Sequence, residues 1–385
     1  MFSSRLPWQS HTNLLTTLLS RKRAAGSEIL DLTESNPTRA CLAYPTEAIA
    51  AALADPRSLI YDPNPAGLQA AREAVAAYCT PHVDPGRIIL TASTSEAYGY
   101  LFKLLANPGE EILIPRPSYP LFDFLAALEN VSVRHYRLAY DDGWHIDFSS
   151  LEAQAGSSTR AVIVVNPNNP TGTFLKREER SRLSRFCAER GIAIVCDEVF
   201  ADYAFAEDPD RVHSLADEHE ALAFSLSGLS KVAGLPQLKL GWIVASGPDA
   251  LRKPALENLE LIADTYLSVG GPVQCAAARL LELRGPIQRS IQARVRSNRD
   301  FLSASIGREC PFRVLPAEGG WYAVIQAPRV RTEEEWVLSL LEQQDVLVQP
   351  GFFFDFESEA FLIVSLLTPE SVFHEGIRRL LTLQP

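Results

Sequence analysis

Lys231 and Asp197 are the two charged residues whose surroundings point most directly to chemistry. Lys231 lies in SLSGLSKVAG, among serines, glycines and small apolar residues rather than other charges. Burial in such surroundings can remove the charge of a lysine and make it a nucleophilic amine. Asp197 ends the apolar run GIAIVCD, where a carboxylate is costly unless it is paired. A helix cap or an internal salt bridge would also explain Asp197, and a surface lysine is the alternative for Lys231.

Two further segments could bind a ligand through neutral polar groups. In TASTSEA, Ser93, Thr94 and Ser95 stand at the expected start of a helix, where backbone amides and hydroxyls suit a phosphate. A capping box explains the same segment, with Ser93 as N-cap and Glu96 three residues later. In NPNNPTG, Asn169 lies between an asparagine and a proline and could donate to a ligand oxygen. A proline-rich turn is the alternative for this segment.

The elements that must position these residues alternate along the chain. From about residue 87, the apolar runs RIILTA, EEILIP, VSVRHY, RAVIVVN and GIAIVCDE are separated by helical patterns near 95–106, 119–129 and 176–190. This alternation predicts an α/β fold in which a mostly parallel sheet carries helices on both faces. The site of such a fold lies at the carboxyl ends of the strands. The polar segments fall at these ends.

The chain divides into three parts by its pattern. We expect residues 1–40 to form an N-terminal helix and arm that packs with the smaller domain. Residues 41–285 are expected to form the large domain that holds the site, and residues 286–385 a smaller α+β domain. Within the last part, FRVLP, WYAVIQ and FLIVSLL are strand patterns, which predict a second sheet.

The composition argues against several other classes of protein. The 385 residues carry a formal net charge of −11, which disfavours nucleic acid because backbone binding needs clustered positive charge. No stretch reaches the apolar length of a membrane span, so we expect no membrane partner. Six scattered cysteines without CxxC spacing argue against a disulfide framework or a metal site, and they favour a reducing cytoplasm.

The order of these motifs resembles the class I/II aminotransferase family of fold-type I pyridoxal-phosphate (PLP) enzymes. NPxNPTG is followed by Asp197 at a strand end, then by Ser230-Lys231, and eight residues later by Lys239 before Gly-Trp. The resemblance covers nearly the whole chain and implies PLP as the cofactor of the large domain. It also implies that Lys231 forms the Schiff base and moves the substrate proton. Asp197 would pair with the pyridine nitrogen, and Asn169 would hydrogen-bond the ring oxygen.

The same resemblance implies further contacts with the cofactor. Tyr119 in RPSYP would stack on the ring. Tyr61 in YDPNPAG is similar to a tyrosine that reaches the phosphate of the neighbouring subunit, which implies a homodimer. Lys239 stands where relatives usually have an arginine on the phosphate, and lysine keeps the charge but lacks the fork. The phosphate would thus be held by Ser93, Thr94, Ser95, Ser230 and Lys239.

Two positions depart from the pattern of the family. Phe200 stands where relatives usually have a tyrosine that donates to the ring oxygen, although Tyr203 lies close by in the sequence. Ile363 in FLIVSLL stands where an arginine usually binds the substrate α-carboxylate, and no Lys or Arg occurs from Thr332 to Ile377. Without a replacement, an α-amino acid would lose roughly ten- to hundred-fold in affinity.

Another cation could replace the missing arginine. Arg39 is our first candidate because it lies in LTESNPTRACLAYP, which resembles the N-terminal segment over the substrate in relatives. Asn36 in the same segment is expected to contact the substrate as well. Arg116, next to RPSYP, is the second candidate. For both arginines, the alternative is a solvated surface side chain.

Three functions remain open from the sequence. The leading expectation is a PLP-dependent aminotransferase of amino acid metabolism, which moves an amino group from a small-molecule donor to a keto acid or aldehyde through Lys231. Ile363 keeps open a lyase, a decarboxylase or another enzyme that breaks a bond at Cα, because the orientation of the substrate selects the bond. A PLP-binding regulatory or structural module without turnover is the third expectation.

Overall fold

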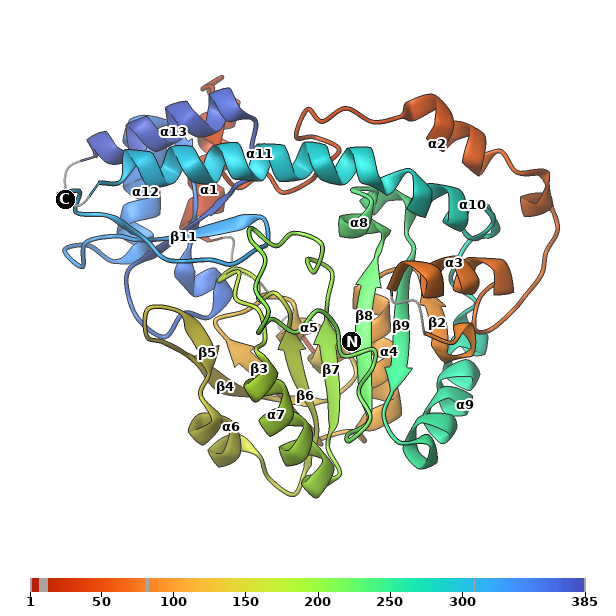
Figure 1. Cartoon of the computed structure of the whole chain (residues 1–385). Helices are drawn as coiled ribbons and strands as arrows, with labels where there is room; N and C mark the ends of the chain where they lie inside the picture. The colour runs from red at the N-terminus through yellow and green to blue at the C-terminus, as the bar shows by residue number, and fades with distance from the viewer. Residues whose placement is uncertain (1, 7–12, 80–82, 308, 384–385) are drawn as a thin grey trace.

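The computed structural model describes residues 2–6, 13–79, 83–307 and 309–383, which are coloured in Figure 1. Eight of the described strands form one sheet: β2 Ile88–Thr91, β3 Glu111–Arg116, β4 Ser132–Tyr140, β5 Trp144–Ile146, β6 Thr159–Val165, β7 Ala193–Asp197, β8 Ala223–Gly228 and β9 Gly241–Ser246. Their order is β2-β9-β8-β7-β6-β3-β4-β5. Strands β8, β7, β6, β3 and β4 run parallel, whereas β9 is antiparallel to both neighbours and β5 to β4.

Helices cover both faces of this sheet because its central strands are buried and apolar on both sides. In β7, Val195 belongs to the hydrophobic cluster on one face and Ile194 to the cluster on the other. The covering helices are α4 Thr94–Leu105, α5 Phe122–Leu128 and α9 Asp249–Tyr266 on the first face, and α6 Phe148–Gln154 and α7 Arg177–Arg190 on the second. A third cluster joins α3 Gln69–Cys79 and α10 Gly271–Glu282 to β2 and β9. The expected α/β fold is confirmed.

A second sheet lies at the upper left of Figure 1, in the last quarter of the chain. It contains β10 Arg313–Val314, β11 Tyr322–Gln326, β13 Gln349–Pro350 and β14 Phe361–Ser365, in the antiparallel order β10-β11-β14-β13. Leu362 and Val364 of β14 share a core with Trp336 of α12 (Glu333–Gln344) and Phe373 of α13 (Glu370–Thr382). The expected second sheet is present, with FLIVSLL as a central strand.

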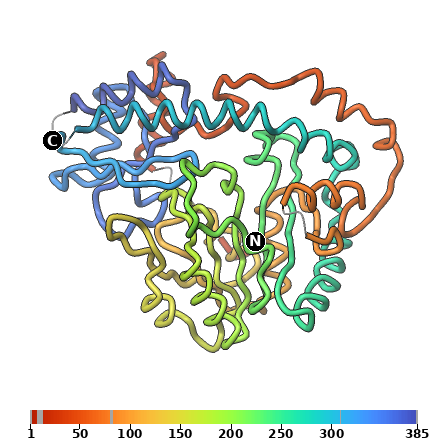
Figure 2. The backbone as a smooth tube through the Cα atoms, in the orientation of Figure 1, coloured from red at the N-terminus to blue at the C-terminus, as the bar shows by residue number. Residues whose placement is uncertain are grey.

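The N-terminal segment packs onto this smaller sheet and its helices. β1 (Leu30–Asp31) pairs in parallel with β12 (Val346–Leu347), and Leu15 and Leu18 of α1 (Leu14–Ala24) join the same core. The 22-residue helix α11 (Arg284–Ser305) is about 33 Å long and runs along the top of the molecule from α10 to the smaller domain, as Figure 2 traces. The boundary expected between residues 285 and 286 falls in its first turn. The domain limits stay a prediction.

Several strand ends meet at the carboxyl edge of the large sheet. Gly241 at the start of β9 permits a close approach, because a Cβ there would lie 3.1 Å from the Ser93 carbonyl carbon and 3.1 Å from Thr91 Oγ1. Asp197 is the last residue of β7, and Asn166 directly follows β6. The parallel strands therefore bring the polar segments of the sequence to one edge.

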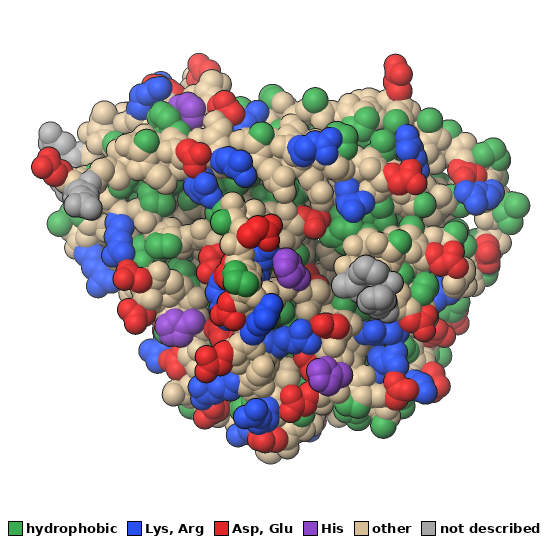
Figure 3. Space-filling model, in the orientation of Figure 1, with side chains coloured by type: hydrophobic (Ala, Val, Ile, Leu, Met, Phe, Trp, Pro, Cys, Tyr) green, Lys and Arg blue, Asp and Glu red, His purple; other side chains and the backbone are tan. Residues whose placement is uncertain are grey.

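The surface shows mixed charge on the side drawn in Figure 3. Lys and Arg side chains are interspersed there with Asp and Glu, rather than gathered into one patch. Among the described residues, no helix is both long enough and apolar enough to span a bilayer.

Candidate active site

Lys231 projects from α8 (Leu229–Val232), a single helical turn that follows β8 directly. Its side chain is partly buried, with Nζ 4.7 Å from the ring centre of Trp321 and 5.3 Å from that of Phe200. Burial lowers the pKa of Lys231 to about 8, and the negative charge of Asp197 opposes this shift. A sizeable fraction of the amine is therefore neutral near pH 8, as a nucleophile requires.

Tyr203 holds the backbone of Lys231 in place through a hydrogen bond. Its hydroxyl donates a 2.6 Å hydrogen bond to the Lys231 carbonyl oxygen, and its ring lies 5.0 Å from the ring of Trp321. Phe200 packs edge-on against the same tryptophan at 5.2 Å. The hydroxyl of Tyr203 thus helps to position Lys231.

Asp197 lies buried at the end of β7. Tyr98 Oη donates to Oδ2 at 3.1 Å, and the Val199 amide donates to Oδ1 at 3.2 Å. Burial raises the pKa of Asp197 to about 6, while both hydrogen bonds and the nearby charge of Lys231 act in the opposite direction. The carboxylate is therefore mostly charged at pH 7 and is available to a cationic partner. The sequence analysis missed Tyr98, which lies on the sheet-facing side of α4.

Asn169 differs from its two neighbouring asparagines in what its amide contacts. Asn166 builds the turn by donating to the Val212 carbonyl oxygen and accepting from the Leu175 amide, both at 2.9 Å. Asn168 accepts from the Thr171 hydroxyl at 2.9 Å. Asn169 is 8% exposed, and its Oδ1 has no partner within the described ranges. The proline-rich turn is present, and the Asn169 side chain makes no hydrogen bond among the described residues, which leaves its Nδ2 available to donate to a ligand oxygen.

The start of α4 contains the capping box and keeps donors for an anion. The Glu96 amide donates to Ser93 Oγ at 3.2 Å, and the Glu96 carboxylate accepts from the Ala92 amide at 2.6 Å. The Ser93 hydroxyl is therefore engaged in the cap. Thr94 and Ser95 lie in the first turn and are partly buried, and first-turn amides have no partner within the helix. These groups suit a phosphate, and Ser93 Oγ, which accepts in the cap, still has its hydroxyl hydrogen to donate, so its phosphate contact stays a prediction.

Three other expected cofactor contacts lie in different surroundings. Tyr119 is partly buried with its ring 5.8 Å from that of Phe122, and burial raises its pKa to about 12. Ser230 is partly buried on α8 beside Lys231. Lys239 is exposed, with a left-handed φ of 53° at the end of the short helix η3 (Pro236–Leu238). The single chain therefore leaves Lys239 open to solvent.

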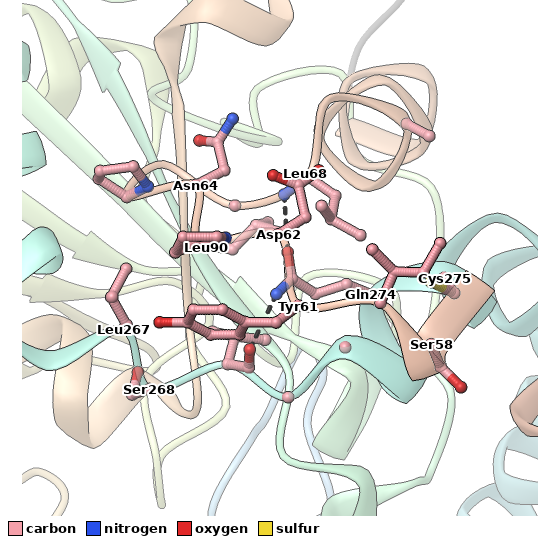
Figure 4. Close-up of a pocket in the computed structure, with 18 of the residues that line it drawn as sticks. Ser58, Tyr61, Asp62, Asn64, Leu68, Leu90, Leu267, Ser268, Gln274 and Cys275 are labelled. Carbon is pink, nitrogen blue, oxygen red and sulfur yellow. Dashed lines mark hydrogen bonds between the residues drawn. The ribbon is translucent and has the colours of Figure 1, made fainter.

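Tyr61 lines a surface pocket of about 570 Å³ together with Ser268, whose hydroxyl donates to Glu96 in the first turn of α4 at 2.6 Å. Figure 4 shows its ring near Ser268, while Gln274 accepts from the Leu68 amide at 2.7 Å and donates to the Val269 carbonyl oxygen at 2.8 Å. Tyr61 is 80% exposed. Its role is testable only in an assembly of two chains.

The expected substrate contacts are dispersed. Ile363 is fully buried in β14 between Val324 and Gln349 of the neighbouring strands. Arg39 is exposed, and Asn36 Oδ1 is engaged in a turn, where it accepts from the Thr38 amide at 3.0 Å and the Thr38 hydroxyl at 2.8 Å. Neither residue has a contact that would identify it as an anchor.

Arg116 ends β3 and lies near two other titratable groups. Its Nε is buried without a partner among the residues described. Its charge contributes to lowering the pKa of His135 to about 4, after burial, and it opposes the raised pKa of Asp355. The second candidate arginine is therefore associated with Asp355 of the smaller domain.

Lys231 predicts a pH dependence of the stability of the cofactor-free protein. Its pKa falls from the ordinary 10.5 to about 8 in the folded state, so between these values the unfolded chain binds more protons. The free energy of unfolding should therefore rise from pH 8 to pH 10.5 in the wild type. Lys231→Met should lack this rise, and at pH 7 it should be more stable than the wild type because it buries no charged amine. Urea unfolding at several pH values measures both free energies, with the exposed Lys253→Met as control. Equal pH slopes in the wild type and Lys231→Met would contradict the prediction.

The donor set fits the PLP implied by the motifs. A buried carboxylate, a buried unpaired amide and a partly neutral lysine lie at one sheet edge, next to the start of α4. Asp197 suits a protonated ring nitrogen, Asn169 a ring oxygen, and the first-turn amides of α4 a phosphate.

Comparison with known proteins relates most of the chain to aminotransferases. Residues 27–380 match the family model described as aminotransferase class I and II. The glutamate-pyruvate aminotransferase AlaA of Haemophilus influenzae is 27% identical over 362 residues, which cover 90% of this chain and 88% of that protein. Nicotianamine aminotransferase 1 of Oryza sativa subsp. japonica is 36% identical over 190 residues, or 48% of this chain and 38% of that protein. The S-alkyl-thiohydroximate lyase SUR1 of Arabidopsis thaliana is 31% identical over 232 residues, or 58% of this chain and 49% of that protein.

Solved structures share the fold. An aminotransferase from Escherichia coli superposes with a TM-score of 0.86 at 22% identity, over 99% of this chain and 97% of that chain. An alanine aminotransferase from Pyrococcus furiosus gives 0.86 at 22% identity, over 98% of each chain.

The architecture is that of fold-type I enzymes: a large, mostly parallel sheet with helices on both faces, and a smaller α+β domain. The chain belongs to the aminotransferase class I and II family, as its motifs predicted. Aminotransferases are transferases of nitrogenous groups, and the family is known to use PLP. The resemblance drawn from the sequence is confirmed.

Proposed function

We propose that this protein is a PLP-dependent aminotransferase that moves an amino group from a small-molecule donor to a carbonyl acceptor. The observation that carries the proposal is the partly buried Lys231 close to the buried Asp197 at the carboxyl edge of the sheet, where the charge of each acts on the pKa of the other. The family match over residues 27–380 and relatives named as aminotransferases support it.

Each residue of the site would have a distinct task. PLP, when bound, supplies an electron sink for the bond broken at the substrate Cα. Asp197 would hold the protonated ring nitrogen, Asn169 would bind the ring oxygen, and Tyr119 would cover the ring. The α4 amides with Thr94 and Ser95 would bind the phosphate. Lys231 would attach the cofactor and then move the proton at Cα, assisted by a pKa of about 8.

A labelled donor tests the reaction type. Holoenzyme is incubated with ¹⁵N-labelled amino donors, one at a time, and with keto acid and aldehyde acceptors. Label in the aminated acceptor supports transamination. Label released only as ammonia would favour a lyase, and carbon dioxide from the donor would favour a decarboxylase. If no donor transfers its nitrogen to any acceptor, the proposal is wrong.

A Cα-bond-cleaving reaction is the second candidate. Ile363 replaces the expected carboxylate anchor, which leaves the orientation of the bonds at Cα open. A lyase is among the relatives, at 31% identity over 232 residues. The ammonia and carbon dioxide measurements above distinguish it from transamination.

A homodimer with Tyr61 at the neighbouring site is the second part of the proposal. Leu59, Ile60 and Tyr61 are 88%, 73% and 80% exposed, which is unusual for three consecutive apolar side chains. They lie beside the pocket shown in Figure 4, where a second chain would bury them. The protein should sediment as a dimer. The Tyr61→Phe variant should remain a dimer but bind PLP more weakly than the wild type. A monomer with full PLP affinity would contradict this prediction.

A further inference from the structure

Ile363 lies on the side of the smaller sheet that faces the large domain. Side chains alternate along β14, so Leu362 and Val364 enter the smaller-domain core, while Phe361 and Ile363 point to the other side. Ile363 packs there with Val324, Leu315 and Phe354. Tyr140 and Trp144 of the large domain pack against the same cluster. The cluster therefore fills space between the two domains with apolar and aromatic side chains.

Aromatic rings connect this cluster to the reactive amine. Trp321 and Phe200 lie 4.7 Å and 5.3 Å from Lys231 Nζ, measured to the ring centres. Tyr322 follows, with its ring 6.3 Å from that of Phe200 and 6.3 Å from that of Phe354. Phe354 then packs with Ile363. Within the described residues, the wall between Lys231 and Ile363 thus consists of aromatic and aliphatic side chains.

A negative charge acts on one ring of this wall, Tyr322. Burial raises the pKa of Tyr322, and the negative charge of Glu34 contributes to the same shift. Glu34 accepts from the Asn36 amide at 2.8 Å, which fixes it in the loop. A substrate carboxylate beside Ile363 would be desolvated and repelled by Glu34, whereas an ammonium group would be attracted.

The segment of the smaller domain around Ile363 provides no guanidinium or ammonium group. Trp321 Nε1 is buried without a partner in the described part of the chain, but it is neutral. Between Thr332 and Ile377 the sequence contains no Lys or Arg, and Arg116 belongs to the large domain, where its charge acts on Asp355 and His135. A carboxylate beside Ile363 therefore has no charged partner from this part of the smaller domain.

We propose that the amino donor is a primary amine with an apolar substituent and no carboxylate on the nitrogen-bearing carbon, and that the acceptor is the matching kind of aldehyde or ketone. This rests on the proposed aminotransferase activity. The C–N bond of the amine breaks, and its carbon is oxidised to a carbonyl whose oxygen comes from water. The nitrogen and the electron pair pass through PLP to the acceptor, which is reduced to an amine while its oxygen leaves as water.

Matched donor pairs test the proposal. Holoenzyme reacts in single turnovers with phenethylamine or phenylalanine, and with isopentylamine or leucine, and the carbonyl product is quantified. At low donor concentration, we expect each amine to react at least about ten-fold faster than the matching amino acid. The reason is that the carboxylate of the amino acid would lack the charge-assisted bond that an arginine would provide. An amino acid that equals or exceeds its amine overturns the inference, as does product from other donors but from neither amine. No product from any donor overturns the aminotransferase proposal itself.

Position 363 is tested by introducing the missing charge. Ile363→Arg should shift the preference toward phenylalanine by at least about ten-fold relative to the uncharged Ile363→Met. A folded Ile363→Arg variant with the wild-type preference overturns the assignment. Calorimetry on PLP-loaded Lys231→Ala, which binds without turnover, gives a readout independent of folding of the arginine variant. There phenethylamine should bind at least about ten-fold more tightly than phenylalanine, and equal affinities overturn the proposal.

Discussion

Replacing Lys231 with alanine is expected to lower kcat/KM for amino transfer by at least ~10³-fold. The substitution removes the amine that would attach the cofactor and move the proton at Cα, and general acid–base catalysis alone contributes roughly 10²- to 10⁴-fold. The pKa of about 8 keeps part of the amine neutral near neutral pH, so this lysine is ready for both tasks. Initial rates of the holoenzyme with a productive donor measure the effect.

A surface lysine provides the matched control for this experiment. Lys253 lies on α9 with a 67% exposed side chain, in an exposed ion pair with Asp249 at 3.1 Å. Lys253→Ala should keep the wild-type rate because it removes the same side chain far from any buried charge. Wild-type turnover in Lys231→Ala would refute the assigned role. A PLP-binding module without turnover should retain part of its function in Lys231→Ala, which separates it from an enzyme.

Asp197→Asn is expected to lower kcat/KM by about 10²- to 10³-fold. A carboxylate about 4 Å from a protonated ring nitrogen contributes roughly 4 kcal/mol at an effective dielectric near 20, and a full loss corresponds to about 10³-fold. Asparagine keeps the size of the side chain, its Oδ1 can still accept from the Val199 amide, and its Nδ2 can donate to the Tyr98 hydroxyl oxygen. The loss would therefore report the charge rather than the packing. Steady-state kinetics and the affinity for PLP are the two measurements.

Tyr98→Phe separates the charge of Asp197 from its hydrogen bonds. This variant removes the 3.1 Å bond to Oδ2 and leaves the carboxylate in place. One hydrogen bond to a charged group is worth roughly 1.5–3 kcal/mol, so a loss of roughly ten- to hundred-fold is expected. If Tyr98→Phe and Asp197→Asn were equally impaired, the charge would not be the important property.

Wild-type affinity for PLP should also weaken as pH falls below about 6, because Asp197 then takes up a proton, and Asp197→Asn should lack this dependence.

The main features of the fold are local in the sequence and could be predicted. The strands of the large sheet are short apolar runs, and the helices between them carry their own periodicity and caps. Lys231, Asp197 and Asn169 could be identified because each is a polar residue at or shortly after the end of such a run. Ser93 shows the limit of this reasoning, since the sequence supports both a cap and a phosphate contact, and the structure contains the cap.

The supporting residues of the site could not be predicted because their contacts span long separations in sequence. Tyr98 meets Asp197 across 99 positions, and Tyr203 supports Lys231 across 28. The packing of helices and loops onto the sheet brings these pairs together, and no local periodicity encodes that packing. Trp321 comes from the smaller domain to lie over Lys231, which requires both domains to be placed.

The environment of Ile363 was determined partly by the sequence and partly by the tertiary structure. The sequence by itself determined that no Lys or Arg occurs from Thr332 to Ile377, so the arginine of relatives is absent whatever the fold. Strand alternation determined that Ile363 and Leu362 point to opposite sides. Only the tertiary structure decided which side faces the large domain, because that depends on how the smaller sheet packs. That packing places Ile363 among the rings that extend to Lys231.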